Sequence, residues 1–171
     1  ITQGTIVDRF EKKFATKVGS KYAVAVSSCS AGLHLACLTY SQRKFKNIVT
    51  SPITFASTAN AILHSGKKPL FCDIDAKDAN ISPDALKLIL KNKNIGGVIP
   101  VHFAGNTCDM KTIKKICKKK NIFIIEDAAH ALGSKYDCGS MVGSCKYSDI
   151  TVFSMHPLKS ITTGEGGMIT T

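Results

Sequence analysis

The chain of 171 residues lacks the sequence features of several protein classes. No apolar run approaches the roughly 20 residues that a membrane-spanning helix needs. No signal peptide is visible, although the chain also lacks an initiator Met. No G-x-G-x-x-G follows a predicted strand, which argues against a nicotinamide-binding sheet domain. We therefore expect a protein that is not inserted in a membrane.

Paired cysteines are also missing. The seven cysteines are scattered, their number is odd, and no C-x-x-C occurs among them. This pattern argues against a zinc site and against a disulfide framework. It favours a reducing compartment, so we expect no metal site and a cytoplasmic location.

Acidic residues are scarce, because 12 Asp and Glu stand against 23 Lys and Arg and give a net charge of +11. A basic chain raises the question of nucleic-acid binding. However, the lysines are spread over many segments, and no basic patch is interleaved with aromatic residues. The run 118–120 closes a predicted helix, where cations complement the helix dipole. We therefore expect no nucleic-acid partner, and a positive surface also suits an anionic cofactor or substrate.

Short apolar runs alternate with amphipathic helical segments along the whole chain. The predicted strands are 22–26, 47–50, 69–74, 97–101, 122–125, 150–153 and 168–170, and the predicted helices are 7–18, 31–40, 55–63, 83–91 and one capped by Asp109. This alternation predicts an α/β sandwich with a mostly parallel sheet. No repeat or low-complexity linker marks a domain boundary.

The first predicted helix has an apolar face. Val7, Phe10, Phe14 and Val18 recur at a spacing of three or four residues, and Gly19 follows as a stop signal. We therefore expect these four side chains to face the core.

Two residues point most directly to chemistry. An apolar run ending in Glu126-Asp127 places a carboxylate at a strand end, and Lys159 follows a second short apolar run. A pyridoxal phosphate (PLP) enzyme needs an acid that keeps the cofactor's ring nitrogen protonated and an amine that carries the cofactor as a Schiff base. Alone, Asp127 reads as a turn residue and Lys159 as a solvated charge, so the prediction rests on their combination.

Hydroxyl or carboxylate side chains follow three predicted strands. The segment 27–31 joins a strand to a helix, and the N–H groups of a helix N-terminus together with a hydroxyl form an anion site. An ordinary serine N-cap is the alternative interpretation. Ser28, Ser30, Asp127 and Ser154 all follow predicted strands, and ligands of such sheets bind at the carboxyl ends of strands. We expect these four residues to converge on one crevice.

The segments 126–133 and 153–167 resemble the signature blocks of the DegT/DnrJ/EryC1/StrS family, and the similarity runs from Ile1 to Thr170. Members of this family are sugar-nucleotide aminotransferases of the type I PLP-dependent fold. The resemblance implies that residues 1–171 form the PLP-binding large domain, a three-layer sandwich, and that a C-terminal small domain is absent from them. It also implies that the full-length protein is a homodimer.

The resemblance assigns roles to the two central residues and to the phosphate-binding turn. Lys159 matches the Schiff-base lysine, which also acts as the catalytic base, and Asp127 matches the partner of the ring nitrogen. Ser30 matches the Thr of a Ser-Gly-Thr turn that holds the cofactor phosphate, with Cys29 in place of the Gly. Ala31 belongs to the same cofactor-binding turn.

Four further residues have counterparts in the family. Ser154 matches a serine whose hydroxyl contacts the phosphate. Phe55 alone reads as a core aromatic at a helix start, but by resemblance it stacks on the pyridine ring. His130 matches a position near the ring's phenolic oxygen, where Gln is the common alternative. His156 matches a variable position, and its role stays open.

The reaction that the resemblance implies is transfer of an amino group from a donor such as glutamate to a nucleotide-linked 4-keto-6-deoxy sugar. The segments 100–105 and 160–163 look most like the 4-aminotransferases of pseudaminic acid biosynthesis, which act on UDP-linked sugars. Sugar dehydratases with the same cofactor are an alternative, but they carry His where this chain has Lys159. A catalytically incomplete fragment that serves as a folding or interaction unit is another.

Overall fold

The computed structural model describes residues 4–91 and 94–171, so residues 1–3, where the family resemblance begins, lie outside the described part. The described residues form a seven-stranded sheet with the strand order β1-β7-β6-β5-β4-β2-β3. The strands are β1 (Ala23–Val26), β2 (Asn47–Thr50), β3 (Lys68–Phe71), β4 (Ile95–Ile99), β5 (Phe123–Asp127), β6 (Ile150–Ser154) and β7 (Gly167–Thr170). The helices are α1 (Thr5–Val18), α2 (Cys29–Leu38), α3 (Ala56–His64), α4 (Pro83–Ile89) and α5 (Met110–Lys118), with a short 3₁₀ turn η1 (Phe103–Gly105).

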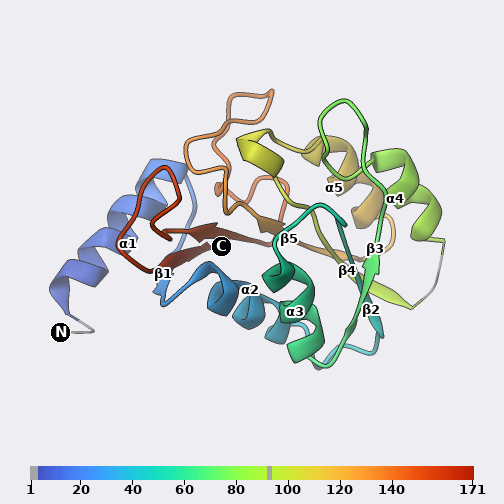
Figure 1. Ribbon diagram of the computed structural model, residues 1–171, viewed down its shortest axis with the longest axis horizontal. Helices are drawn as coiled ribbons and strands as arrows, with labels where there is room; N and C mark the ends of the chain where they lie inside the picture. The colour runs from blue at the N-terminus through green and yellow to red at the C-terminus, as the bar shows by residue number, and fades with distance from the viewer. Residues whose placement is uncertain (1–3, 92–93) are drawn as a thin grey trace.

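Helices cover both faces of the sheet, so the chain folds as a three-layer sandwich (Figure 1). One core lies between the sheet and α2 and α3, and includes Leu33 and Ile62. The other core lies between the sheet and α1, α4 and α5, and includes Phe14 and Ile113. The predicted α/β sandwich is confirmed. Among the described helices, each is too short or too polar to span a bilayer.

The central strands are buried along their whole length because both of their faces are covered. All five residues of β5 and all five of β6 are buried, whereas the edge strands β1 and β3 contain only half-buried and exposed residues. β2 to β6 pair in parallel, and β7 pairs antiparallel with both β1 and β6. The expected mostly parallel sheet is therefore confirmed.

The predicted elements all occur, but several of their bounds differ. The third predicted strand was expected to reach residue 74, yet β3 ends at Phe71. Asp73 and Asp75 cause this early end, because their carboxylates accept the N–H groups of Ile74 and Lys77 and turn the chain. Asp109 caps α5 as predicted, since its carboxylate accepts the N–H of Thr112.

The apolar face of α1 is only partly buried. Phe14 and Val18 belong to the core, but Phe10 is 36% exposed and Ile6 is 73% exposed. The expectation that Phe10 faces the core is therefore wrong. The buried residues of α1 lie in its C-terminal half, and its N-terminal end extends beyond the edge of the sheet (Figure 1).

Strand direction determines which loops share one edge of the sheet. Since β1 and β6 both run antiparallel to β7, the carboxyl ends of β1, β6, β5, β4 and β2 lie together at that edge. β7 begins at the same edge, where Gly167 pairs with both Val26 and Ser154. The loops at this edge form the candidate site.

Candidate active site

A cavity of about 480 Å³ opens at the carboxyl ends of the strands. Its walls come from the loops after β1, β2, β4, β5 and β6 and from the turn before β7. The lining residues are Ser28, Cys29, Ser30, Ile53, Thr54, Phe55, Ser57, Val101, Phe103, Asp127, Ala129, His130, Ser154, His156, Leu158, Lys159, Glu165 and Gly166. The predicted convergence of Ser28, Ser30, Asp127 and Ser154 on one crevice is confirmed. Phe55, His130 and Lys159 reach the same cavity.

Asp127 ends β5 at the floor of the cavity and is only 4% exposed. Its Oδ2 accepts a hydrogen bond of 2.7 Å from the hydroxyl of Thr58, and its Oδ1 accepts the N–H of Ala129 at 3.2 Å. The strand backbone is also held, because the N–H of Asp127 donates to the carbonyl of Pro100. The carboxylate is therefore oriented by two donors before any ligand arrives.

Thr54 and Thr58 are site residues that the sequence analysis missed. Thr58 is fully buried in α3, and its hydroxyl lies 2.7 Å from that of Thr54. The spacing of four residues, which places two side chains on one face of a helical turn, was the available signal. It did not identify Asp127 as the partner, because that contact joins residues 69 positions apart.

Lys159 lies on the loop between β6 and β7 and is half-buried. The base of this loop is closed where the N–H of Met155 donates to the carbonyl of Gly166 at 2.9 Å. The hydroxyl of Thr162 also donates to the carbonyl of Met155, at 2.9 Å. Within the described residues, Nζ of Lys159 has no hydrogen-bond or ion-pair partner, and the side chain lines the cavity together with Asp127. An unpaired amine thus shares a cavity with an oriented carboxylate.

The turn between β1 and α2 presents backbone donors to the cavity. Ser28 is the N-cap of α2, and its hydroxyl accepts the N–H of Ala31 at 3.1 Å. Ser28 and Ser30 line the cavity, whereas Ala31 does not. The N–H groups of Cys29 and Ser30 precede the first intrahelical bond, so they stay available to an anion.

A glycine lets β7 pass close to this turn. A Cβ at Gly167 would lie 2.7 Å from the carbonyl carbon of Ser28 and 2.8 Å from the nitrogen of Cys29. These are backbone atoms that cannot move without opening the turn. Ser154 lies beside Gly167 in the sheet register and brings its hydroxyl to the same cavity. The turn, Gly167 and Ser154 together form a cradle for a small anion.

Cys29 stands where the resembled turn has Gly, and the structure accommodates it. Its backbone is not among the residues with positive φ, so this turn does not require glycine. Burial is the main cause that raises the pKa of the Cys29 thiol well above its ordinary value, and Asp127 raises it further while Lys159 acts in the opposite direction. Cys29 is therefore a neutral thiol in the cavity wall near pH 7.

Phe55 is 79% exposed at the N-terminus of α3. The interpretation of Phe55 as a core aromatic is therefore wrong. The side chain lines the cavity instead, where a flat apolar face is open to a ligand. Aromatic faces stack well on heterocyclic rings.

His130 lies three residues after Asp127 and lines the cavity near Lys159. Partial burial, and secondarily the positive charge of Lys159, lower its pKa, and Asp127 offsets part of this effect. The imidazole is therefore neutral near pH 7 and offers one N–H donor and one acceptor. Its ring packs edge-on against Phe103 with centroids 6.5 Å apart.

His156 also reaches the cavity, and its role was left open by the sequence. Its Nδ1 accepts the N–H of Leu158 at 3.2 Å, so the other nitrogen, Nε2, carries the proton in the neutral ring. Nε2 lies 3.8 Å from the carboxylate of Glu165. This pair links the two ends of the loop that carries Lys159.

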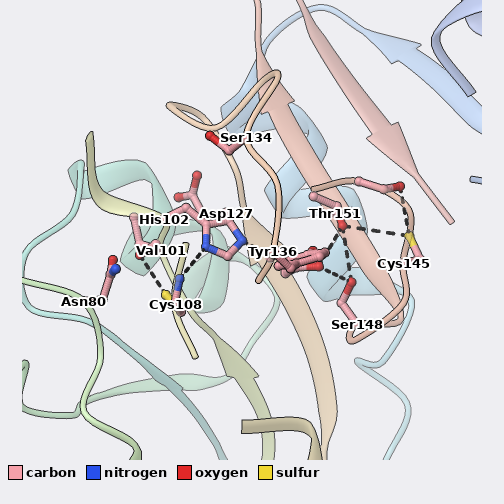
Figure 2. Close-up of polar contacts among 12 residues, drawn as sticks. Asn80, Val101, His102, Cys108, Asp127, Ser134, Tyr136, Cys145, Ser148 and Thr151 are labelled. Carbon is pink, nitrogen blue, oxygen red and sulfur yellow. Dashed lines mark hydrogen bonds and ion pairs between the residues drawn. The ribbon is translucent and has the colours of Figure 1, made fainter. Parts of the chain in front are cut away.

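Behind the cavity, on the opposite face of β5, lies a buried polar network. Glu126 is fully buried, and its Oε2 accepts from His102 at 2.7 Å and from the hydroxyl of Tyr136 at 2.6 Å. Its Oε1 accepts from Ser148 and, at 3.1 Å, from Thr151. In Figure 2, His102 lies to the left, and Tyr136, Ser148 and Thr151 lie to the right of it. One carboxylate thus ties together β5, β6 and the loops on both sides.

The protonation states in this network follow from its contacts. Nδ1 of His102 accepts the N–H of Cys108 at 3.1 Å, so Nε2 holds the proton that is donated to Glu126. Burial alone would raise the pKa of Glu126, but the hydrogen bonds from His102, Ser148 and Tyr136 outweigh burial and lower it. Burial and then the Glu126 carboxylate raise the pKa of Tyr136, which remains a donor. The described residues contain no cluster of three or more metal-binding side chains.

The amino-acid sequence of this chain is similar to those of known proteins. Residues 1–171 match the family model described as the DegT/DnrJ/EryC1/StrS aminotransferase family. The chain is 44% identical to the spore coat polysaccharide biosynthesis protein SpsC of Bacillus subtilis, over all of this chain and 43% of that protein. It is 43% identical to a UDP-4-amino-4,6-dideoxy-N-acetyl-beta-L-altrosamine transaminase of Campylobacter jejuni, over 99% of this chain and 44% of that protein.

Solved structures show the same fold. PseC of Helicobacter pylori, an aminotransferase involved in the biosynthesis of pseudaminic acid, superimposes with a TM-score of 0.94 at 34% identity, over 99% of this chain and 45% of that one. NtdA of Bacillus subtilis, solved with bound cofactor PMP, superimposes with a TM-score of 0.89 at 28% identity, over 99% of this chain and 38% of that one. The chain thus spans less than half the length of the relatives it matches.

Proposed function

Since this chain belongs to the DegT/DnrJ/EryC1/StrS aminotransferase family, we propose that the whole protein is a PLP-dependent aminotransferase acting on a nucleotide-linked keto sugar. The observation that carries the proposal is the cavity that Asp127 and Lys159 share at the carboxyl ends of the parallel strands. In this proposal, residues 1–171 are the PLP-binding large domain of a longer protein.

The chemistry of the cavity fits PLP. The N–H groups of Cys29 and Ser30 and the hydroxyls of Ser30 and Ser154 suit the phosphate, which helix N-termini commonly bind. The open face of Phe55 suits the pyridine ring. The carboxylate of Asp127, already oriented by Thr58 and Ala129, suits a protonated ring nitrogen.

Bound PLP supplies an electron-poor ring that takes up the charge left when a proton leaves the substrate carbon next to the amino nitrogen. Asp127 keeps the ring nitrogen protonated, which maintains this capacity. Nζ of Lys159 would hold the cofactor at rest and, once released, would remove that proton from the substrate carbon and deliver it to the cofactor carbon on the other side of the shared nitrogen. His130, neutral near pH 7, can hydrogen-bond the ring's phenolic oxygen from the wall of the cavity.

The presence of Lys159 favours amino transfer over dehydration. A dehydratase of the family would carry His at this position, and His cannot hold the cofactor covalently in the same way. The free amine of Lys159 in the cavity therefore supports a transaminase.

The finer proposal names the substrate. The altrosamine transaminase of Campylobacter jejuni and PseC of Helicobacter pylori are similar to this chain throughout its length. We extend the proposal to a UDP-linked 4-keto-6-deoxy amino sugar, with glutamate as donor, in surface polysaccharide or glycan biosynthesis. The complete protein would act as a cytoplasmic homodimer.

The test is a coupled assay of the complete protein with glutamate and a panel of 4-keto UDP- and dTDP-sugars. We expect 2-oxoglutarate and the amino sugar in equal amounts, with UDP-sugars preferred. Borohydride reduction and peptide mapping should place the pyridoxyl group on Lys159, and Lys159→Ala should abolish turnover while the protein still folds. Labelling of another lysine would refute the assignment of Lys159.

A further inference from the structure

The hydrogen bonds around Asp127 form a chain with a direction. The hydroxyl of Thr58 has one proton and donates it to Oδ2 of Asp127 at 2.7 Å. The 2.7 Å contact between Thr54 and Thr58 must then use a proton from Thr54, because that of Thr58 is already engaged. The direction is therefore from Thr54 to Thr58 to Asp127.

This chain of hydrogen bonds is shielded from water at its centre. Thr58 is fully buried and Asp127 is 4% exposed, while Thr54 is half-buried in the cavity wall. Hydrogen bonds in such surroundings are electrostatically stronger than in water, and donors in series polarise one another. A donor to a carboxylate stabilises its charged form. Without the Thr58 hydroxyl, a proton shared between Asp127 and a ligand would thus lie more often on Asp127.

We propose that Thr54 and Thr58 form a relay of positioning residues that keeps the shared proton on the ring nitrogen of PLP rather than on Asp127. The inference rests on the proposed function, since it assumes that Asp127 meets that nitrogen. The relay also joins two walls of the cavity, because Thr54 directly precedes Phe55. The contact with the ring face and the contact with the ring nitrogen are therefore held by the same turn at the start of α3.

Other titratable groups also act on Asp127, but substitutions of Thr54 or Thr58 would leave these groups in place. Lys159 faces it from the loop after β6, His130 from the loop after β5, and Cys29 from α2. Glu126 and its partners lie on the other face of β5. If the protonation of the ring nitrogen changes when the Thr58 hydroxyl is removed, the change can therefore be attributed to the relay.

The experiment uses the complete protein loaded with PLP that is labelled with ¹⁵N in the ring. The ¹⁵N chemical shift reports how much of the ring nitrogen is protonated. We expect a protonated ring nitrogen in the wild type. In Thr58→Val, the ratio of molecules with the proton on the ring nitrogen to molecules with it on Asp127 should fall roughly tenfold. This is the size expected when one hydrogen bond to a charged group is lost. Thr58→Ser, which keeps the hydroxyl, should match the wild type.

A second variant protects the test against misfolding. Thr54→Val removes the first donor but lies in a half-buried position, so it should fold and shift the ratio in the same direction by a smaller factor. A protonated nitrogen in the wild type that is unchanged in both valine variants would overturn the relay and leave the proposed function intact. An unprotonated nitrogen in the wild type, or no bound PLP, would overturn both.

Discussion

Replacing Glu126 by Leu should destabilise the fold strongly. Leu fills a similar volume but accepts none of the four hydrogen bonds that the carboxylate now receives. Ser148 and Thr151 can still bond to each other, because their hydroxyls lie 3.3 Å apart. The buried N–H of His102 and O–H of Tyr136 would have no acceptor.

Each buried donor that loses its partner costs about 1–3 kcal/mol, so we expect Glu126→Leu to lose about 4 kcal/mol of unfolding free energy. Glu126→Gln should lose less, because the amide oxygen can face His102 and Tyr136 while its NH₂ faces the two hydroxyls. Asp137→Asn is the control. Asp137 is exposed in the same loop as Tyr136, and this change should stay within about 0.5 kcal/mol of the wild type.

Urea unfolding of the cofactor-free variants, followed by far-UV circular dichroism, measures these differences. The fold lowers the pKa of Glu126 below its ordinary value of 4.5. The carboxylate's contribution is therefore fully present above that value and is lost as the pH falls through the lower pKa of the folded state. The gap between the wild type and Glu126→Gln should narrow on acidification below 4.5. A loss under about 1 kcal/mol in Glu126→Leu, or a gap independent of pH, would refute the reasoning.

Three further outcomes are expected. Phe55→Leu should leave thermal stability unchanged, because Phe55 is 79% exposed, but should weaken PLP binding in a titration by up to about tenfold through loss of stacking; equal affinity would remove Phe55 from the site. Gly167→Ala should lower the melting temperature, since its Cβ would lie 2.7–2.8 Å from backbone atoms of Ser28 and Cys29, and such overpacking costs about 1–3 kcal/mol; an unchanged melting temperature would contradict this geometry. The complete protein should scatter light as a dimer, and a fully active monomer would refute the proposed homodimer.

Local patterns were sufficient to predict the elements and the place of the site. The alternation of short apolar runs with helical periodicity identified every strand and every helix of four residues or more, because burial imposes those periods on each segment. The convergence of Ser30, Asp127 and Ser154 followed from the rule that parallel strands end at one edge. Lys159 was placed with them by its combination with Asp127 and by its family motif.

Contacts between distant segments could not be predicted in the same way. Nothing local indicates that β7 inserts antiparallel between β1 and β6, since pairing order depends on the whole sheet. The partners of Glu126 come from three other segments of the chain, and Thr58 meets Asp127 across 69 positions. The exposure of Phe10 was missed because an apolar residue at a periodic position reads as buried whether or not a neighbouring element covers it. Phe55 alone also read as a core aromatic, and only the family resemblance placed it at the cavity.

Glu126 and Asp127 are neighbours in β5, and their side chains point to opposite faces of the sheet. This arrangement disfavours a shift of β5 along its neighbouring strands. A slip of β5 by one position would exchange the two carboxylates between the faces. A slip in one direction would place Asp127, which is one methylene shorter, against the four donors that Glu126 now satisfies. A slip in the other direction would place the longer Glu126 at the floor of the cavity beside Thr58. The hydrogen-bond network around Glu126 therefore disfavours a shifted alignment of β5, because a side chain of another length would not satisfy its donors. The same network thereby keeps Asp127 in its place in the cavity.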